Sequence, residues 1–181
     1  MMRLADAIRD GGGARDGSTW YSVGELSVES GQLGIADLGQ VAAVRVPVPN
    51  GLYHFEAQLI EPDNCPRVSR LRGIAAGMTG ERSVQCGRIS VELAHVSVAD
   101  VDAIQRKLNR GEFEEMLQLA ANFGHVDGDI CQLNFESGTV QFIVCSSGSA
   151  DGCYPVYTLV SGQRVVGLEI VFVGDENRPR S

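Results

Sequence analysis

The sequence contains almost no lysine and no long apolar run. Only one of its 15 basic residues, Lys107, is a lysine, and the others are arginines. A catalytic lysine or a phosphate-loop lysine therefore has a single candidate. No apolar run approaches the roughly 18 residues of a membrane helix, and residues 1–13 lack the basic head and apolar stretch of a secretory signal. We therefore expect a soluble protein that stays in the cytoplasm.

The usual signatures of catalysis and of metal binding are also missing. There is no Gly-x-Ser-x-Gly elbow for a serine nucleophile, no His-Glu-x-x-His and no Cys-x-x-Cys. The three histidines, His54, His95 and His125, have no partner at metal-binding spacing, so we expect local hydrogen bonds to satisfy them. The sequence therefore predicts no metal and no cofactor.

Charge and cysteine content narrow the choice of partner and compartment. The formal net charge is −8, which opposes binding to a phosphate backbone, so nucleic acid is not an expected partner. The five cysteines are an odd number without a pairing pattern, which indicates reduced thiols rather than a disulfide framework. We expect most of them to be small buried residues. With membrane and nucleic acid both unexpected, a protein partner is left open.

Hydrophobic alternation predicts a mainly β chain. Short stretches with a period of two are separated by glycine, proline, asparagine and serine, which is typical of strands and turns. The expected strands are 25–28, 32–36, 41–48, 52–61, 67–75, 87–96, 131–135, 139–145, 154–160 and 164–173. Asn50-Gly51 favours a hairpin between the third and fourth of these strands, and Ser161-Gly162 favours one between the last two.

The period changes after Ser97, where helices are expected. Asp100 is a candidate N-cap for a helix through Arg110, and a second helix is expected from Glu112 to Phe123. The chain of 181 residues is expected to form one domain. Its parts are an N-terminal arm (1–22), a mainly β domain (23–175) with a helical insertion (100–123), and a frayed tail (176–181). The predicted fold is α+β, mainly β: two packed antiparallel sheets, as in a β-sandwich, with the helical pair covering one end.

Several motifs resemble a bacterial family of uncharacterised function. The run from Ser146 to Tyr157, followed after a turn by Val165 to Ile170, resembles the tail of the family called domain of unknown function 4241. Three further pieces fit the same family: 31–37, 46–53 and 67–74. The family brings no established activity, so the resemblance implies kinship in fold and transfers no catalytic role to any residue.

A loop rich in serine and glycine, between two apolar strands, is the first candidate ligand site. Small residues let a backbone approach a ligand, and Asp151 offers a carboxylate that can orient it. Gly152 and Tyr154 follow directly. The alternative is a simple Asp-Gly turn, in which the carboxylate caps backbone amides.

Two arginines form the second part of the candidate site. Arg70 and Arg72 lie two residues apart on an expected strand, so they share a face, and Arg67 is close by. Guanidinium groups in this arrangement can clamp a carboxylate or a phosphate. The alternative is a sheet face whose arginines are satisfied by surface ion pairs.

These features favour a non-catalytic binding or protein-interaction module, to which no catalytic residue is assigned. One alternative is a hydrolase of unrecognised type that uses the Ser146 to Cys153 loop, with Cys145, Cys153 and His125 as its reactive groups. Another is an immunity or antitoxin-like protein whose acidity meets the basic surface of a toxin.

Overall fold

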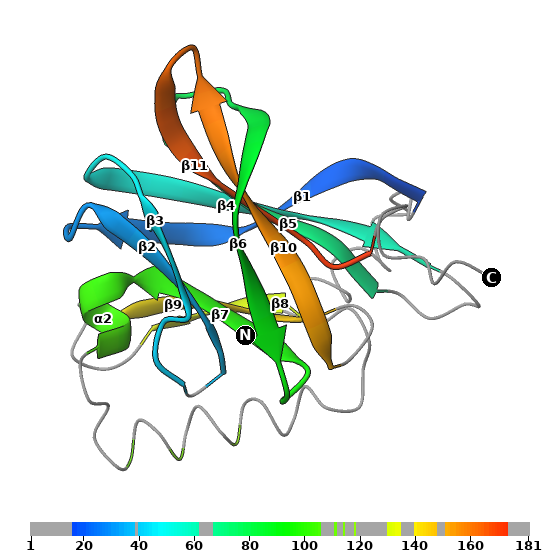
Figure 1. Cartoon of the computed structure of the whole chain (residues 1–181). Helices are drawn as coiled ribbons and strands as arrows, with labels where there is room; N and C mark the ends of the chain where they lie inside the picture. The colour runs from blue at the N-terminus through cyan, green and yellow to red at the C-terminus, as the bar shows by residue number, and fades with distance from the viewer. Residues whose placement is uncertain are drawn as a thin grey trace.

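The computed structural model describes residues 16–38, 40–61, 67–105, 130–134, 140–147 and 151–173, with the single positions 111, 114 and 118. These residues form two antiparallel sheets (Figure 1). The six-stranded sheet runs in the order β1 (Asp16–Val28), β4 (Gly51–Ile60), β5 (Arg67–Ala75), β11 (Arg164–Val171), β10 (Gly152–Ser161), β6 (Glu81–Val91). The five-stranded sheet runs in the order β3 (Val44–Pro47), β2 (Gln32–Asp37), β7 (His95–Asp100), β9 (Gln141–Ser146), β8 (Ile130–Asn134). The predicted mainly β fold with two antiparallel sheets is confirmed.

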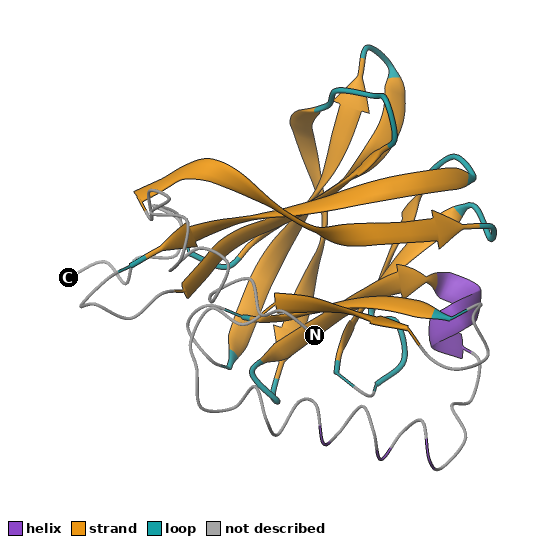
Figure 2. Ribbon diagram, turned by 180° about the vertical axis from the view of Figure 1, so that it is seen from behind, coloured by secondary structure: helices purple, strands orange, loops and turns teal. Residues whose placement is uncertain are grey.

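The main core lies between the two sheets, which are stacked one above the other (Figure 2). Strand β4 shows why: Tyr53, Phe55 and Ala57 point inward and are fully buried, as their alternation with polar residues predicts. Ile143 and Cys145 of β9 meet them from the other sheet. Each large apolar side chain buried in this way contributes about 1.5–3 kcal/mol to stability.

A second, smaller apolar cluster lies on the other face of the five-stranded sheet. It contains Phe142 and Val144 of β9, and Ala103 and Ile104 of the short helix α2 (Val101–Gln105) pack against it. Strand β9 is therefore buried on both faces, which accounts for its unbroken apolar run from Phe142 to Cys145. Of the expected helical pair, residues 106–110 and most of 112–123 lie outside the described residues.

Asp100 caps helix α2 and also ties down a distant turn. Its Oδ1 accepts a hydrogen bond from the Asp102 amide at 2.8 Å, which confirms the predicted N-cap. Its Oδ2 accepts the amides of Glu29 and Ser30 at 2.7 and 2.8 Å. Burial alone raises the pKa of this carboxyl group, but the three backbone hydrogen bonds outweigh burial and hold the pKa below its ordinary value.

The free edge of β1 is covered by side chains from the other sheet. Gln132 of β8 accepts from the Glu25 amide at 3.1 Å and donates to the Glu25 carbonyl at 2.8 Å, as a neighbouring strand would. Gln141 of β9 accepts from the Ser27 amide at 3.2 Å. These side-chain amides satisfy backbone groups that an open sheet edge would expose.

Two sequence predictions need correction. The Asn50-Gly51 turn does not form a hairpin, because β3 pairs with β2 in one sheet and β4 pairs with β1 and β5 in the other. The expected strand 87–96 is instead the end of β6, a turn at Ala94 with a φ of 56°, and the start of β7. Among the cysteines whose surroundings the structure describes, Cys145 is buried, as expected of most of them, whereas Cys86 and Cys153 are exposed.

Strand β1 and the β10–β11 hairpin also bear on the predictions. Strand β1 begins at Asp16, inside the segment 1–22 that the sequence assigns to an arm. The predicted last hairpin is confirmed: β10 and β11 pair through Ser161 and Arg164, and Gly162 between them has a φ of 62° that suits glycine.

Candidate functional site

The residues of the serine- and glycine-rich loop that the structure describes lie at the start of β10. Asp151 is exposed, but Tyr154 is only 4% exposed and points into the core. Its ring meets Phe172 edge to face, with 5.3 Å between the ring centroids. Burial raises the pKa of Tyr154; a hydrogen bond with Ser147 opposes that rise, and the charge of Asp151 adds to it. A Cβ at Gly152 would lie 2.9 Å from the Tyr154 hydroxyl, so the glycine permits this packing.

The cysteines beside this loop have different surroundings. Cys145 is 1% exposed and belongs to the main core. Cys153 is exposed, and Arg88 of β6 donates from Nε to its Sγ at 3.3 Å and from Nη2 to its carbonyl at 2.9 Å. His125, the third group of the predicted hydrolase, lies outside the described residues.

Arg70 and Arg72 lie on the outer face of the six-stranded sheet, away from the core. Tyr154 points to the inner face of the same sheet, so the sheet itself separates it from the two arginines. Along the strands, Arg72 stands opposite Glu169, which stands opposite Tyr157. Gly152 is five positions from Tyr157 on β10, about 16 Å away at the rise of a strand. The structure therefore does not bring the five predicted ligand residues together.

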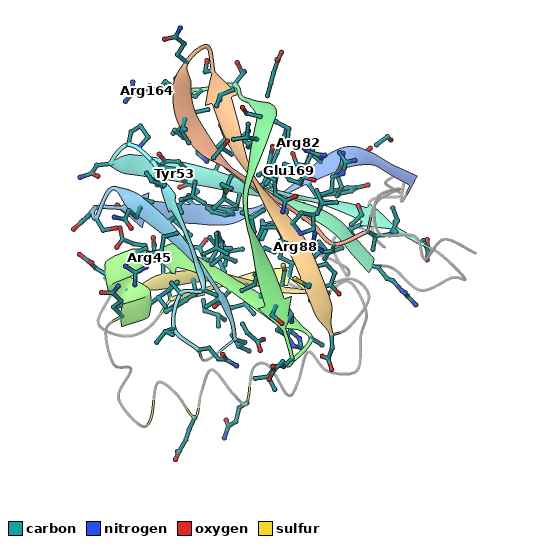
Figure 3. All side chains as sticks on the ribbon, in the orientation of Figure 1. Arg45, Tyr53, Arg82, Arg88, Arg164 and Glu169 are labelled. Carbon is teal, nitrogen blue, oxygen red and sulfur yellow. The ribbon has the colours of Figure 1, made fainter. Side chains whose placement is uncertain are left out.

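A buried carboxylate organises the arginines of the outer face. The side chain of Glu169 is only 6% exposed. Its Oε1 forms an ion pair with Arg82 of β6 and lies 3.8 Å from Nη1 of Arg70. Figure 3 shows Arg82 beside Glu169 at the crossing of β6 and β10. The guanidinium of Arg82 also lies over the ring of Tyr157, 4.8 Å from its centroid. We call Arg70, Arg82 and Glu169 the Glu169 cluster.

Arg72 of β5 is held by two partners, one on β4 and one on β1. Its Nε and Nη2 reach Oε2 of Glu56 at 2.8 and 2.7 Å. The guanidinium carbon lies 3.8 Å from the centroid of the Trp20 ring on β1. Cross-strand pairing explains both contacts, because Glu56 is the register partner of Arg72 and Trp20 lies on the next strand.

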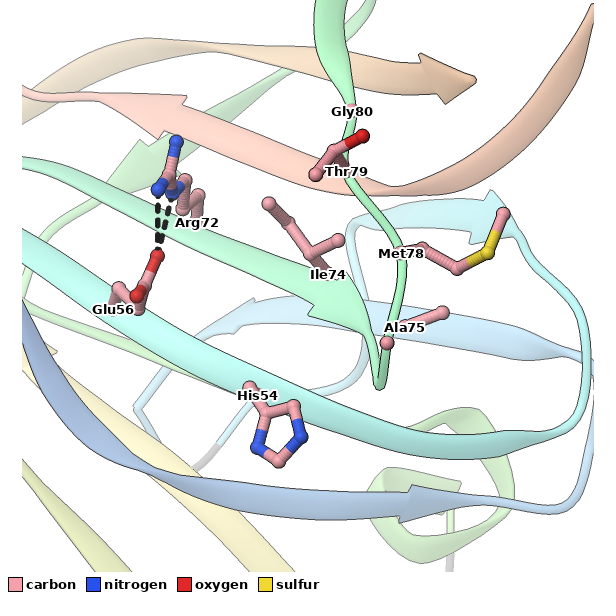
Figure 4. Close-up of a pocket in the computed structure, with 9 residues that line it drawn as sticks. His54, Glu56, Arg72, Ile74, Ala75, Met78, Thr79 and Gly80 are labelled. Carbon is pink, nitrogen blue, oxygen red and sulfur yellow. Dashed lines mark hydrogen bonds and ion pairs between the residues drawn. The ribbon is translucent and has the colours of Figure 1, made fainter. Parts of the chain in front are cut away.

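A pocket of about 340 Å³ opens beside this ion pair on the outer face. Its walls come from strands β4 and β5 and from the connection to β6: His54, Glu56, Arg72, Ile74, Ala75 and residues 77–80. Figure 4 shows the Arg72–Glu56 pair at one end of the pocket and Met78 at the other. The pocket thus joins a charged wall to an apolar wall formed by Ile74, Ala75 and Met78. We call it the outer-face pocket.

The imidazole of His54 is oriented from β1. Its Nδ1 lies 2.9 Å from Oε1 of Glu25, and both side chains are about half exposed. Within the described part of the chain, no hydrogen bond is found for Nε2, the other ring nitrogen. Because Nδ1 is paired with Glu25, the imidazole of His54 has a fixed orientation at the rim of the pocket.

Neither the role of Glu169 nor the pairing of His54 is predicted from the sequence. A signal for Glu169 existed: it is the one charged residue in the apolar run from Val165 to Val173, and a buried carboxylate requires partners. A signal for the Glu56–Arg72 pair existed as well, since two adjacent strands carried charges at alternate positions. The pocket itself had no signal, because residues 76–80 give no pattern.

Among the described residues, no group of three or more His, Cys, Asp or Glu side chains is placed to hold a metal ion. None of the described helical residues belongs to a helix long and apolar enough to cross a membrane.

Comparison of the chain with models of protein families, with curated proteins and with solved structures finds no match. The resemblance to domain of unknown function 4241 therefore stays a prediction. The outer face, with its pocket and its ion pairs, is the feature of the molecule that bears on function.

Proposed function

We propose that this chain is a non-catalytic binding module of the cytoplasm, and that the outer-face pocket is its ligand site. The observation that carries the proposal is the pocket itself, in which a charged wall and an apolar wall face one volume of about 340 Å³. Small-molecule sites begin at about this size and combine apolar walls with a few fixed polar groups.

The polar groups of the pocket are held in place before any ligand arrives. Arg72 is fixed by Glu56 and by the Trp20 ring, and His54 is fixed by Glu25. Side chains that are already ordered lose little conformational entropy when a ligand binds. A cytoplasmic location suits Cys86, Cys145 and Cys153, which are free thiols.

The test is a fragment screen followed by amide chemical shifts of the isotope-labelled protein. We expect some fragments to shift the amides of residues 74–80 in the wild type. Thr79→Trp should abolish these shifts, because the indole fills the pocket from an exposed position. Leu93→Trp, at the exposed β6–β7 turn and at the other end of β6 from the pocket, is the matched control and should leave them unchanged. If no fragment shifts residues 74–80, or if Thr79→Trp leaves the shifts intact, the pocket is not the ligand site.

An enzyme is the second candidate, and the Glu25–His54 pair is the observation that favours it. A carboxylate that orients an imidazole is a common arrangement for a general base. The proton spectrum of each bound fragment, recorded after long incubation with the protein, separates the two candidates. A binding module returns the fragment unchanged, whereas conversion that is lost in His54→Gln would establish an enzyme.

A further inference from the structure

We infer that the ligand of the outer-face pocket is a small organic anion, a carboxylate or a phosphate joined to an apolar group. This inference rests on the proposed function. The anionic group would meet Arg72 and the adjoining Glu169 cluster, and the apolar group would pack on Ile74 and Met78.

An excess of positive charge on the outer face favours an anionic ligand. Within the described ranges, Arg70, Arg72 and Arg82 share two carboxylates, those of Glu56 and Glu169. Arg70 and Arg82 both approach the same oxygen, Oε1 of Glu169, so their like charges are close together. Such repulsion is costly without a further anion. The chain as a whole carries −8, so this patch differs in sign from the rest of the molecule.

Glu25 offsets this excess only in part. In register it lies beside His54 and Ile74 rather than beside Glu56 and Arg72. Its Oε1 is also occupied by His54. A carboxylate that is half exposed is screened by water and salt, so its effect on the arginines is weak.

The three arginines also keep hydrogen-bond donors that an anion can use. A guanidinium carries five N–H donors. Arg72 directs Nε and Nη2 at one oxygen of Glu56, and Arg82 directs Nη2 at Glu169. Arg70 lies 3.8 Å from Glu169, beyond hydrogen-bond distance. Each arginine thus keeps donors for another acceptor, and all three side chains are between a quarter and two fifths exposed.

Two of these arginines are held in position by aromatic rings. Arg72 lies over Trp20 and Arg82 over Tyr157. Stacking fixes the plane of a guanidinium, which suits recognition of planar carboxylates and of phosphates. Because Glu169 stands opposite Arg72 in register, the cluster continues directly from the charged wall of the pocket.

The apolar wall selects among anions. Ile74, Ala75 and Met78 line the same volume as Arg72, so an inorganic ion would leave this wall uncovered. A nucleic-acid backbone is disfavoured by the net charge of −8. A small molecule with one anionic group and a short apolar chain satisfies both walls.

The experiment is a titration of the labelled protein with four probes that share one alkyl chain: hexanoate, hexyl phosphate, hexylammonium and hexanol. Hexanoate, hexyl phosphate or both should shift the amides of residues 74–80 and the Nε–H signal of Arg72. The stronger of these two probes identifies the anionic group. Hexylammonium and hexanol should bind at least tenfold more weakly, since one charge-assisted contact is worth about that factor.

Variants assign the effect to the arginines. Arg72→Gln and the double variant Arg70→Gln/Arg82→Gln should weaken anion binding by about tenfold. Arg88→Gln is the matched control, because it removes the same charge from the same sheet, beside Cys153 and away from the pocket. Glu169→Gln should bind the anion several-fold more tightly, since it removes a competing charge. A merely structural role for Glu169 predicts no such gain.

The outcomes separate this inference from the proposed function. If hexylammonium or hexanol shifts residues 74–80 as strongly as the anions, the ligand is not an anion, although the pocket still binds. If none of the four probes binds while fragments of other chemistry do, the inference is likewise overturned and the binding module stands. If neither the four probes nor any other fragment shifts residues 74–80, both the inference and the proposed function are overturned.

Discussion

The two faces of the six-stranded sheet are built from alternate residues of the same strands, yet they are stabilised in different ways. On β4, Tyr53, Phe55 and Ala57 are fully buried against the other sheet, whereas His54 and Glu56 between them carry ion pairs at the surface. The inner face gains stability from burial of apolar area, which does not depend on partners of fixed geometry. The outer face holds charges in fixed pairs that contribute little to stability when exposed. The first face therefore makes the fold, and the second is available for function.

Phe55 should give the largest effect on stability. It is fully buried, and its ring lies on Gly73, its register partner on β5. We expect Phe55→Ala to lower the free energy of unfolding by about 3–5 kcal/mol, as for other buried aromatic residues. Urea denaturation followed by circular dichroism measures it. A loss below about 1 kcal/mol would mean that the inner face is not the main source of stability.

The same contact can be tested from the other side. A Cβ at Gly73 would overlap the Phe55 ring, so Gly73→Ala should cost about 1–3 kcal/mol. Phe55→Leu leaves room for this methyl group. The double variant Phe55→Leu/Gly73→Ala should therefore lose less stability than the sum of the losses in the two single variants. Strict additivity would show that the ring and the glycine do not touch in solution.

Glu169 is the one place where the charged face approaches the energetics of the core. Glu169→Gln keeps the shape of the side chain but leaves Arg70 and Arg82 without their shared carboxylate. We expect a loss of about 1–3 kcal/mol, less than for a fully buried pair because the guanidiniums are partly exposed. Glu25→Gln is the matched control, since that carboxylate is half exposed, and it should cost under about 1 kcal/mol. Equal losses would remove the distinction between buried and exposed charge.

The sequence was sufficient for the inner face and insufficient for the outer one. Alternation on β4 and the double-sided apolar pattern of β9 gave the buried positions, because burial depends only on side-chain type and strand period. Asp100 was also found, since a capping residue acts within its own helix. The outer-face site depends on which strands are neighbours. Arg70 and Arg72 were recognised as sharing a face, but Glu169, the ion-pair partner of Arg70, is about a hundred residues away, and sheet order decides that they meet.

The corrections have the same cause. Asn50-Gly51 has the local chemistry of a hairpin turn, yet it carries the chain from one sheet to the other. The turn at Ala94 has no glycine or proline, and it is held by a distant contact in which the Glu92 amide donates to Asp37 at 3.0 Å. Local propensity is overridden by tertiary hydrogen bonds in both places.

Asp100 shows how the fold holds a charge that it does bury. Its folded-state pKa is below the ordinary value of 3.8, so the charged form is favoured by folding. The contribution to stability is therefore complete above the ordinary pKa and is lost as the pH falls through the lowered one. We expect Asp100→Asn to cost about 1–2 kcal/mol at neutral pH, since the amide cannot accept all three backbone hydrogen bonds. In urea unfolding at pH values down to about 3, the difference from wild type should shrink. A difference that is constant with pH would exclude the charge as its cause.

Arg72 should give the smallest effect on stability and the largest on binding. Arg72→Lys keeps the positive charge but loses the two-nitrogen contact with Glu56 and the stacking on Trp20. Because both members of the Arg72–Glu56 pair are partly exposed to water, we expect the free energy of unfolding to fall by only about 0.5–1 kcal/mol. If the outer face is for function, the same variant should still weaken hexanoate or hexyl phosphate severalfold, since a lysine offers no planar fork. Parallel measurement of unfolding and of binding decides between the two roles. A large loss of stability with unchanged binding would make Arg72 a structural residue like those of the inner face, and the contrast between the two faces would fail at the residue on which it depends most.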